Sequence, residues 1–404
     1  WFHYAVFSLG QLKGEGSSME IYNLPLYIVI GVMHQWRLAA LFVISGMGTA
    51  FAFRRRTWQT YVKERGIRLG IPLLFTTYIL FFGIFKFETL LLLFSIFPGS
   101  ENMPYGHLWF IYNLLIYSIL LTPLFAHIRN NPEGRVVRCI LSILRIRHGL
   151  GILLLPPIIL SINGILFKPW AFGEVGMWWE FPRYLLYFLF GFLLISAKEQ
   201  YFTVIDKIRI PVTVLTPVFA LLWFVLSTNS DIPNVMEGGW INDGFSAFSI
   251  DATIASVVQS FHAWFWCLLI FTWASKLLNK PNKLLVYLNE AVYPTYIVHM
   301  HLTFLPIAIF GILGINYYVS LLFGTILVFI GVMICFEIVR RAKYFRVLFG
   351  IKGGNEAVNR IYPYDKIKNH KFRIIFAISC HILTILMIIG LMVQLILAGI
   401  LTPS

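Results

Sequence analysis

The sequence has little charge for its length. Only 12% of its 404 residues are Asp, Glu, Lys or Arg, whereas a soluble globular domain carries about 25%. Hydrophobic residues make up 58% of the chain and aromatic residues 17%, and the mean hydropathy is +0.77. This composition excludes an ordinary soluble domain. It predicts a polytopic membrane protein with aromatic side chains at the lipid interfaces.

Cysteine is also scarce, and the motifs of several enzyme classes are missing. The four cysteines show no CxxC spacing, so they predict neither a disulfide framework nor a cysteine-based metal site. There is no HExxH, Walker or GxSxG motif, which argues against a zinc protease, a P-loop NTPase and an α/β-hydrolase. No internal repeat and no inverted pair of broken helices stands out. We therefore expect no metal and no permanently bound cofactor.

What the sequence does contain is a series of hydrophobic segments. A membrane-spanning helix needs about 20 apolar residues, and the chain predicts an all-α polytopic transmembrane helix bundle of about 10–11 spans. We expect the first span to be truncated, with its beginning before Trp1. The predicted segments are Trp1–Leu9, Leu24–Phe53, Leu69–Phe97, His107–His127, Leu150–Phe167, Arg183–Ser196, Ile210–Leu226, Ile254–Ser275, Leu284–Phe310, Tyr317–Val339 and Ile374–Leu401.

The bundle is predicted to occupy residues 1–350. A basic cytoplasmic linker over residues 351–372 would follow, and then an additional transmembrane helix over residues 373–404. The polar stretch between Asn355 and His370 separates that last helix from the other spans. We therefore expect the last helix to be an appendage to the bundle.

The lysines and arginines are distributed unevenly between the two sides of the predicted bundle. Alternating the loops from span to span places 27 of the 32 basic residues on one side. Positive residues collect on the cytoplasmic side of membranes. The net charge of +14 is therefore mainly a topology signal, with attraction to anionic membrane lipids as a secondary effect. We expect a multi-pass bacterial inner-membrane protein with an extracytoplasmic C-terminus and no nucleic-acid partner.

Several ionisable residues fall inside or beside the hydrophobic segments, where they usually face a cavity or a partner. His34 and Arg37 lie one turn apart on one face of the second span and indicate an anion site or a water-filled cavity. His3, His107 and His299 lie in three other spans and on the same, outer side. His107 has an equally plausible role as an interfacial residue.

Arginines occur at both ends of the predicted spans. Arg65 and Arg68 lie three residues apart at the cytoplasmic mouth of the third span, where they are either ordinary positive-inside charges or phosphate ligands. Arg183 opens the sixth span from the outer side, either as an interfacial residue that reaches the headgroups or as a functional residue. Both pairs of alternatives stay open on the sequence alone.

Two further histidines lie within spans. His301 follows His299 by two residues, which places the two side chains on different faces of a helix. We therefore expect at most one of them to face the core, and the pair to be a poor metal site. His262 lies on an apolar helix and is predicted to be a core histidine.

Short motifs follow one another in a distinctive order over about residues 1–310. They are Phe2-His3-Tyr4, His34-Gln35-Trp36-Arg37, Phe42-Val43-Ile44-Ser45-Gly46, Arg65-Gly66-Ile67-Arg68-Leu69-Gly70-Ile71-Pro72, His107-Leu108-Trp109-Phe110 and Tyr293-Pro294-Thr295-Tyr296-Ile297-Val298-His299. In this order and spacing the chain resembles the acyltransferase-3 family of integral-membrane O-acyltransferases. Within that family it is similar to the glucan-biosynthesis protein C subgroup, which succinylates periplasmic glucans.

The resemblance implies transfer of an acetyl or succinyl group from cytoplasmic acyl-CoA to a hydroxyl of an extracytoplasmic glycan or glycolipid. His3 would be catalytic, as general base or as nucleophile. Arg37, together with His34, would stabilise the developing oxyanion or hold a dicarboxylic acyl chain. Arg65 and Arg68 would bind the phosphates of the donor. The residues predicted to bind substrate are His34, His107, Trp109, Tyr293 and His299.

Two other classes of protein remain open at this stage. A transporter or flippase of a lipid-linked or acylated substrate would also need polar groups within its spans. The lack of repeat symmetry and of intramembrane carboxylates for proton coupling argues against it. A non-catalytic membrane scaffold would not need so many polar residues on one side of the bundle.

Overall fold

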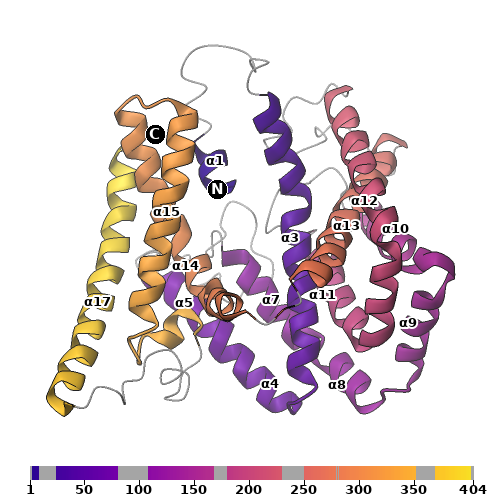
Figure 1. The fold of residues 1–404 in the computed structure, drawn as a ribbon, viewed down its shortest axis with the longest axis horizontal. Coiled ribbons are helices and arrows are strands. Elements are labelled where there is room, and N and C mark those ends of the chain that lie inside the picture. The colour runs from indigo at the N-terminus through magenta and orange to yellow at the C-terminus, as the bar shows by residue number, and fades with distance from the viewer. Residues whose placement is uncertain are drawn as a thin grey trace.

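In the computed structural model, the chain is described over residues 2–8, 24–80, 108–167, 180–229, 250–278, 280, 282–351 and 369–401. These residues form helices and turns, with no strand among them, so the predicted all-α fold is confirmed (Figure 1). Seven of these helices are long and apolar enough to cross a membrane. A bent pair makes an eighth span if it is counted as one. The chain is a multi-pass integral membrane protein.

The helices follow the predicted segments closely. Seven of them contain a candidate span: α3 (Leu24–Phe53), α10 (Leu150–Phe167), α12 (Lys198–Asn229), α13 (Ile250–Leu277), α14 (Lys283–Ile312), α15 (Tyr317–Val339) and α17 (His370–Leu401). The bent pair is α7 (Trp109–Leu120) with α8 (Thr122–Asn130), which meet at 49°.

The predicted count of 10–11 spans is higher than seven or eight because three predicted segments form shorter helices within the described residues. The first of these is α1 (Phe2–Phe7), with six residues, and another is α11 (Glu180–Ser196), with 17. The third predicted segment begins in η2 (Gly66–Gly70), α5 (Ile71–Phe75) and η3 (Thr76–Leu80) and continues beyond the described residues. All three are helical where they are described.

Helix α3 lies at the centre of the bundle and packs most extensively against α11 (Figure 1). Two glycines permit this close approach. A Cβ on Gly46 would lie 2.0 Å from the Phe188 carbonyl oxygen, and a Cβ on Gly191 would lie 2.0 Å from the Val43 carbonyl oxygen. Small residues at helix contacts let backbones approach closely in membrane proteins. The sequence therefore brings α3 and α11 into backbone contact.

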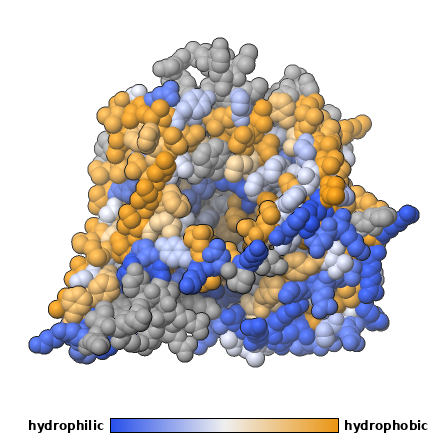
Figure 2. All heavy atoms as spheres, viewed as in Figure 1, coloured by the Kyte–Doolittle hydropathy of each residue, from blue (hydrophilic) through white to orange (hydrophobic). Residues whose placement is uncertain are grey.

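One end of the bundle carries many of the basic residues. The end of α3 meets the end of α11 through a hydrogen bond from Arg54 Nη2 to the Ile195 carbonyl, at 3.0 Å. Arg129 of α8 donates to the Arg56 carbonyl, and Lys198 of α12 lies over the Phe51 ring. In Figure 2, hydrophilic side chains gather at the lower right of the view, where this end of the bundle lies, and hydrophobic side chains lie above them. Two short helices complete this end: α4 (Trp58–Arg65) and α9 (Arg135–Arg145).

The last helix, α17, packs along α14 and α15 at one edge of the molecule (Figure 1). Ile388 and Leu391 of α17 share an apolar cluster with Val332 and Phe336 of α15. Before it, the chain leaves α15 at Arg340 and forms the short helix η8 (Arg346–Phe349). The predicted linker lies mostly in residues 352–368, outside the described residues.

Candidate functional site

The short helix α1 is held in the bundle by aromatic contacts with α15. The Tyr4 ring rests on Gly324, where an added Cβ would lie 2.0 Å from Tyr4 Cζ. Tyr4 Oη is 2.9 Å from Ser320 Oγ, and Tyr317 Oη donates to the Ala5 carbonyl at 2.9 Å. Because His3 is the neighbour of Tyr4, these contacts fix the stretch of α1 backbone that carries His3.

His3 contacts a second histidine from the far end of the sequence. His3 Nδ1 lies 2.9 Å from His299 Nε2, and the two rings stack with centroids 4.9 Å apart. On its other side, His299 Nδ1 lies 2.8 Å from the Tyr296 carbonyl and 3.2 Å from the Thr295 carbonyl. The sequence predicted both histidines as site residues but not their direct contact.

Arg37 completes this group, which we call the histidine cluster (His3, Arg37 and His299). Arg37 Nη1 lies 3.4 Å from His3 Nε2. Tyr184 of α11 and Tyr296 of α14 lie close enough to Arg37 to interact with it electrostatically. The cluster therefore joins α1, α3 and α14 within the apolar part of the bundle.

The partners of the cluster determine where its protons lie. A backbone carbonyl only accepts, so the proton of neutral His299 is on Nδ1, and its Nε2 is an acceptor for His3 Nδ1–H. A guanidinium only donates, so the contact from Arg37 requires an unprotonated His3 Nε2. The two constraints come from opposite ends of the cluster and agree. They leave the lone pair of His3 Nε2 directed towards Arg37.

The remaining residues predicted for the outer site lie around this cluster. His34 is one turn before Arg37 on α3 and interacts electrostatically with both His3 and Arg37. Trp109 is buried at the start of α7 and packs against Tyr184, with ring centroids 5.3 Å apart and the ring planes tilted by 42°. Trp109 therefore supports a neighbour of Arg37. His107 lies outside the described residues.

Arg65 and Arg68 line a second feature, a cavity of about 220 Å³, which we call the arginine pocket. Its charge is positive, because the single lining glutamate, Glu64, pairs with Arg56 at 3.0 Å. Its lining residues are Ser45, Gly48, Ala52, Arg56, Tyr61, Glu64, Arg65, Arg68, Leu114 and Tyr293. Tyr293, a predicted substrate-binding residue, therefore lies with the two predicted donor-binding arginines.

The arginines of this pocket are braced by hydroxyls and aromatic rings. Arg65 Nη2 donates to Thr49 Oγ1 at 3.0 Å, and its guanidinium lies 5.0 Å from the Tyr61 ring centre. The Arg68 guanidinium lies 5.5 Å from the Tyr293 ring centre. The buried Arg68 Nε has no hydrogen-bond partner among the described residues. Arg68 also belongs to the π-helix η2, a wide helical turn that often occurs at functional sites.

Two helices connect the histidine cluster to the arginine pocket. On α14, Tyr293 of the pocket and His299 of the cluster are six residues apart, about 9 Å along the helix axis. On α3, Arg37 of the cluster and Gly48 of the pocket are eleven residues apart, about 16 Å along the axis. The cluster and the pocket are therefore separated by about 9–16 Å along the axes of these two helices.

A third polar group, which the sequence did not predict, lies between α3, α11 and α13. Arg183 is buried and pairs with Glu180 at 3.4 Å. It also donates to Gln259 Oε1 at 3.4 Å, and Gln259 in turn donates to Gln35. This buried position does not fit the interpretation of Arg183 as an interfacial residue that reaches the lipid headgroups. The group braces the segment of α3 that carries Arg37.

The other candidate histidines lie apart from the cluster. His301 is buried on another face of α14, with Nε2 3.5 Å from the Leu80 carbonyl. His262 is buried between α12 and α13, where its ring stacks over Trp223. Within the parts of the chain that the structure describes, no three His, Cys, Asp or Glu side chains gather as metal ligands.

Comparison with known proteins identifies the family. Residues 1–339 match the model of the acyltransferase-3 family, described as an acyltransferase domain. No curated protein and no solved structure matches the chain significantly. The family match includes every residue of the histidine cluster and of the arginine pocket. The chain therefore belongs to the acyltransferase-3 family of membrane-bound O-acyltransferases.

Proposed function

We propose that this protein transfers an acetyl or succinyl group from cytoplasmic acyl-CoA to a hydroxyl of an extracytoplasmic glycan or glycolipid. The observation that carries the proposal is the bonded series from the Tyr296 carbonyl through His299 to His3. It places an unprotonated imidazole nitrogen beside a guanidinium. A base next to a fixed positive charge is the arrangement that acyl transfer to a hydroxyl requires.

The reaction follows from the positions of these atoms. When the substrates bind, Arg37 turns from His3 Nε2 to the thioester carbonyl oxygen, and the acceptor hydroxyl takes its place as the donor to His3 Nε2. His3 Nε2 then removes the proton of this hydroxyl, whose oxygen attacks the thioester carbonyl. Arg37 stabilises the negative oxygen of the tetrahedral intermediate. When the intermediate collapses, the C–S bond breaks, and the leaving thiolate takes the proton back from His3 Nε2. The products are an O-acyl ester and free CoA, and His3 ends in its starting state.

His299 serves as a positioning residue in this mechanism. Its Nδ1–H is committed to backbone carbonyls of α14, so its Nε2 accepts from His3 Nδ1. This contact keeps the His3 proton on Nδ1 and leaves Nε2 unprotonated beside Arg37. His34, one turn from Arg37, adds a polar group that would tolerate the carboxylate of a succinyl chain.

The arginine pocket would hold the phosphates of the donor. Guanidinium groups suit phosphate because they donate parallel hydrogen bonds to its oxygens. The unpartnered Arg68 Nε and the surplus positive charge of the cavity support this role. The concentration of basic residues at this end supports a cytoplasmic location for the pocket. The C-terminus would then be extracytoplasmic, in the bacterial inner membrane.

The proposal is tested by the O-acyl content of envelope glycans in cells that lack the gene and are complemented with variants. We expect mass spectrometry to detect acyl esters with the wild-type protein and none with His3→Ala. His127→Gln is a matched control because His127 is exposed on α8, away from the cluster. Unchanged acylation by a normally inserted His3→Ala protein would contradict the proposal, and the mass of the lost group would identify it.

A further inference from the structure

The segment that follows the family-matched region folds back under the arginine pocket. Residues 340–351 come directly after the match to residues 1–339, and we call them the C-terminal strap. They leave α15, form η8 and end at Ile351, which is buried. Their contacts with α14 and with α5 place them next to two residues of the pocket.

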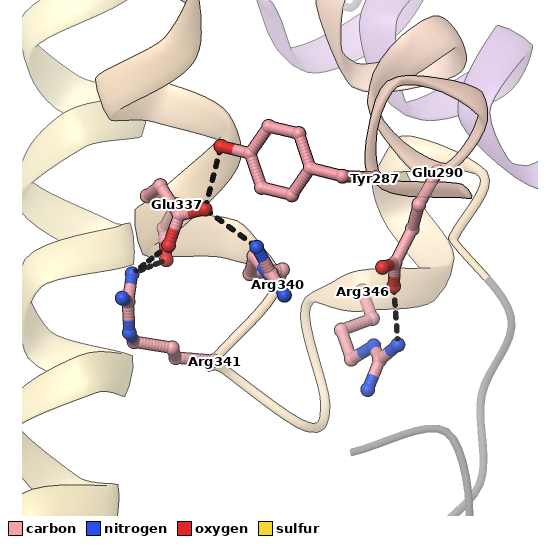
Figure 3. Close-up of polar contacts among 6 residues, drawn as sticks. All are labelled: Tyr287, Glu290, Glu337, Arg340, Arg341 and Arg346. Atoms are coloured by element: carbon pink, nitrogen blue, oxygen red, sulfur yellow. Dashed lines mark hydrogen bonds and ion pairs between the residues drawn. The ribbon is translucent and has the colours of Figure 1, made fainter. Parts of the chain in front are cut away.

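The beginning of the strap is fixed by a carboxylate at the end of α15. Glu337 accepts a hydrogen bond from Tyr287 Oη of α14 at 2.7 Å, and it pairs with Arg340 and Arg341 (Figure 3). Tyr287 comes from the first turns of α14, so this group ties the end of α15 to the start of α14. The strap therefore begins from a defined position.

The middle of the strap is anchored to α14 by a buried ion pair. Arg346 is 1% exposed, and its Nη2 lies 3.0 Å from Glu290 Oε1 (Figure 3). Glu290 is one helical turn before Tyr293, so the two side chains are neighbours on α14. The ion pair thus holds the strap beside the residue whose ring covers Arg68.

The end of the strap touches both pocket residues directly. Gly350 has a φ of +71°, and an added Cβ there would lie 3.0 Å from Tyr293 Cβ and 3.1 Å from the Arg68 carbonyl oxygen. Glycine suits this position because it tolerates positive φ and has no side chain to displace its neighbours. The preceding residue, Phe349, packs on Phe75 of α5, with ring centroids 5.4 Å apart.

We propose that the C-terminal strap positions Arg68 and Tyr293 through its contacts with them, and that it thereby sets the affinity of the arginine pocket for its phosphate-bearing donor. The inference rests on the proposed function of the pocket. Gly350, Arg346 and Glu290 are positioning residues, since they act through Arg68 and Tyr293. Changes at these three positions should then alter donor binding and leave the chemistry at His3 unchanged.

The test measures coenzyme A binding to the full-length protein in detergent or nanodiscs, together with kcat and KM for acetyl-CoA. We expect Gly350→Ala to raise the Kd and the KM about tenfold while kcat stays at the wild-type value. Glu290→Gln should act in the same direction, and it tests the inference if Gly350→Ala does not fold. Lys343→Gln is the matched control, because it removes an exposed charge from the same segment.

Equal Kd values for the wild type, Gly350→Ala and Glu290→Gln would overturn the inference and leave the proposed function intact. A fall in kcat without a change in Kd would also overturn it, because the strap would then act on the chemistry. A wild-type protein that does not bind coenzyme A would overturn the proposed donor and this inference with it.

Discussion

The histidine cluster and the arginine pocket share α3 and α14 but use their charges differently. In the cluster, His3 contacts both Arg37 and His299, and His299 binds the backbone of its own helix. In the pocket, the arginines line a cavity of about 220 Å³ and exceed the acidic groups around them. Preorganised polar groups favour catalysis, whereas surplus charge in a cavity favours capture of an anion. The comparison therefore favours the proposed division, with chemistry in the histidine cluster and donor binding in the arginine pocket.

The two regions also differ in how the chain holds them. The cluster depends on the position of α1. That position is set by Tyr4, which bonds to α15, and by Tyr317 of α15, which bonds to the α1 backbone. In the pocket, Arg65 and Arg68 come from neighbouring turns of α4 and η2, and Gly350 of the strap lies against the Arg68 backbone and Tyr293. Variants of one region should consequently change kcat, and variants of the other should change the KM for the donor.

Variants of Arg37 are expected to show the largest change in kcat with the least change in the KM for the donor. Arg37→Gln removes the positive charge beside His3 Nε2 and should lower kcat about 10²–10³-fold, as loss of an oxyanion-stabilising donor does. The KM for acyl-CoA should change little. Arg37→Lys keeps a positive charge and should retain intermediate activity. Steady-state kinetics with an acceptor glycan would show this, and a raised donor KM with normal kcat would place Arg37 in donor binding instead.

Arg68 should give the opposite pattern. Arg68→Gln removes a charged donor from the pocket, and the lost hydrogen bonds should raise the KM for acyl-CoA roughly 10- to 100-fold. At saturating donor the rate should approach that of the wild type. Arg55→Gln is a suitable control because Arg55 is exposed at the same end of the bundle. If Arg55→Gln and Arg68→Gln have the same KM for acyl-CoA, both arginines serve only as positive-inside charges that set the membrane topology.

His299 tests whether the cluster works as one unit. His299→Phe removes the acceptor for His3 Nδ1 and should lower kcat about tenfold, the effect of one lost hydrogen bond. His299→Gln can still offer an oxygen acceptor and should retain more activity than His299→Phe. Measurement of kcat and of the KM for acyl-CoA distinguishes the two His299 variants. Equal activity of the two variants would remove His299 from the mechanism.

The smallest expected effect concerns the support of α1. Gly324→Ala introduces a Cβ against the Tyr4 ring, and overpacking of this kind destabilises by about 1–3 kcal/mol. We expect a lower melting temperature and a few-fold loss of kcat. Gly331→Ala, on the same helix, meets only the flexible end of Leu302 and serves as the control. A similar melting temperature and activity for both variants would show that Tyr4 does not position His3.

The sequence predicted the parts of these regions that depend on local spacing. Hydrophobic length predicted the helices, and the separation of Arg65 and Arg68 predicted that they share a location. Pairings over long sequence separations were not predictable, because nothing local links His3 to His299, 296 residues away. For the same reason the burial of Arg183 beside Glu180 and Gln259 was missed, although polar residues at a span end were a visible signal.

The central claim is that His3 performs the chemistry without holding the donor. The most direct measurement compares coenzyme A binding with single-turnover acyl transfer for purified His3→Gln and wild-type protein in nanodiscs. We expect equal Kd values and a transfer rate about 10²–10⁴-fold lower in the variant, the usual contribution of a general base. Transfer at the wild-type rate by the folded variant would contradict it.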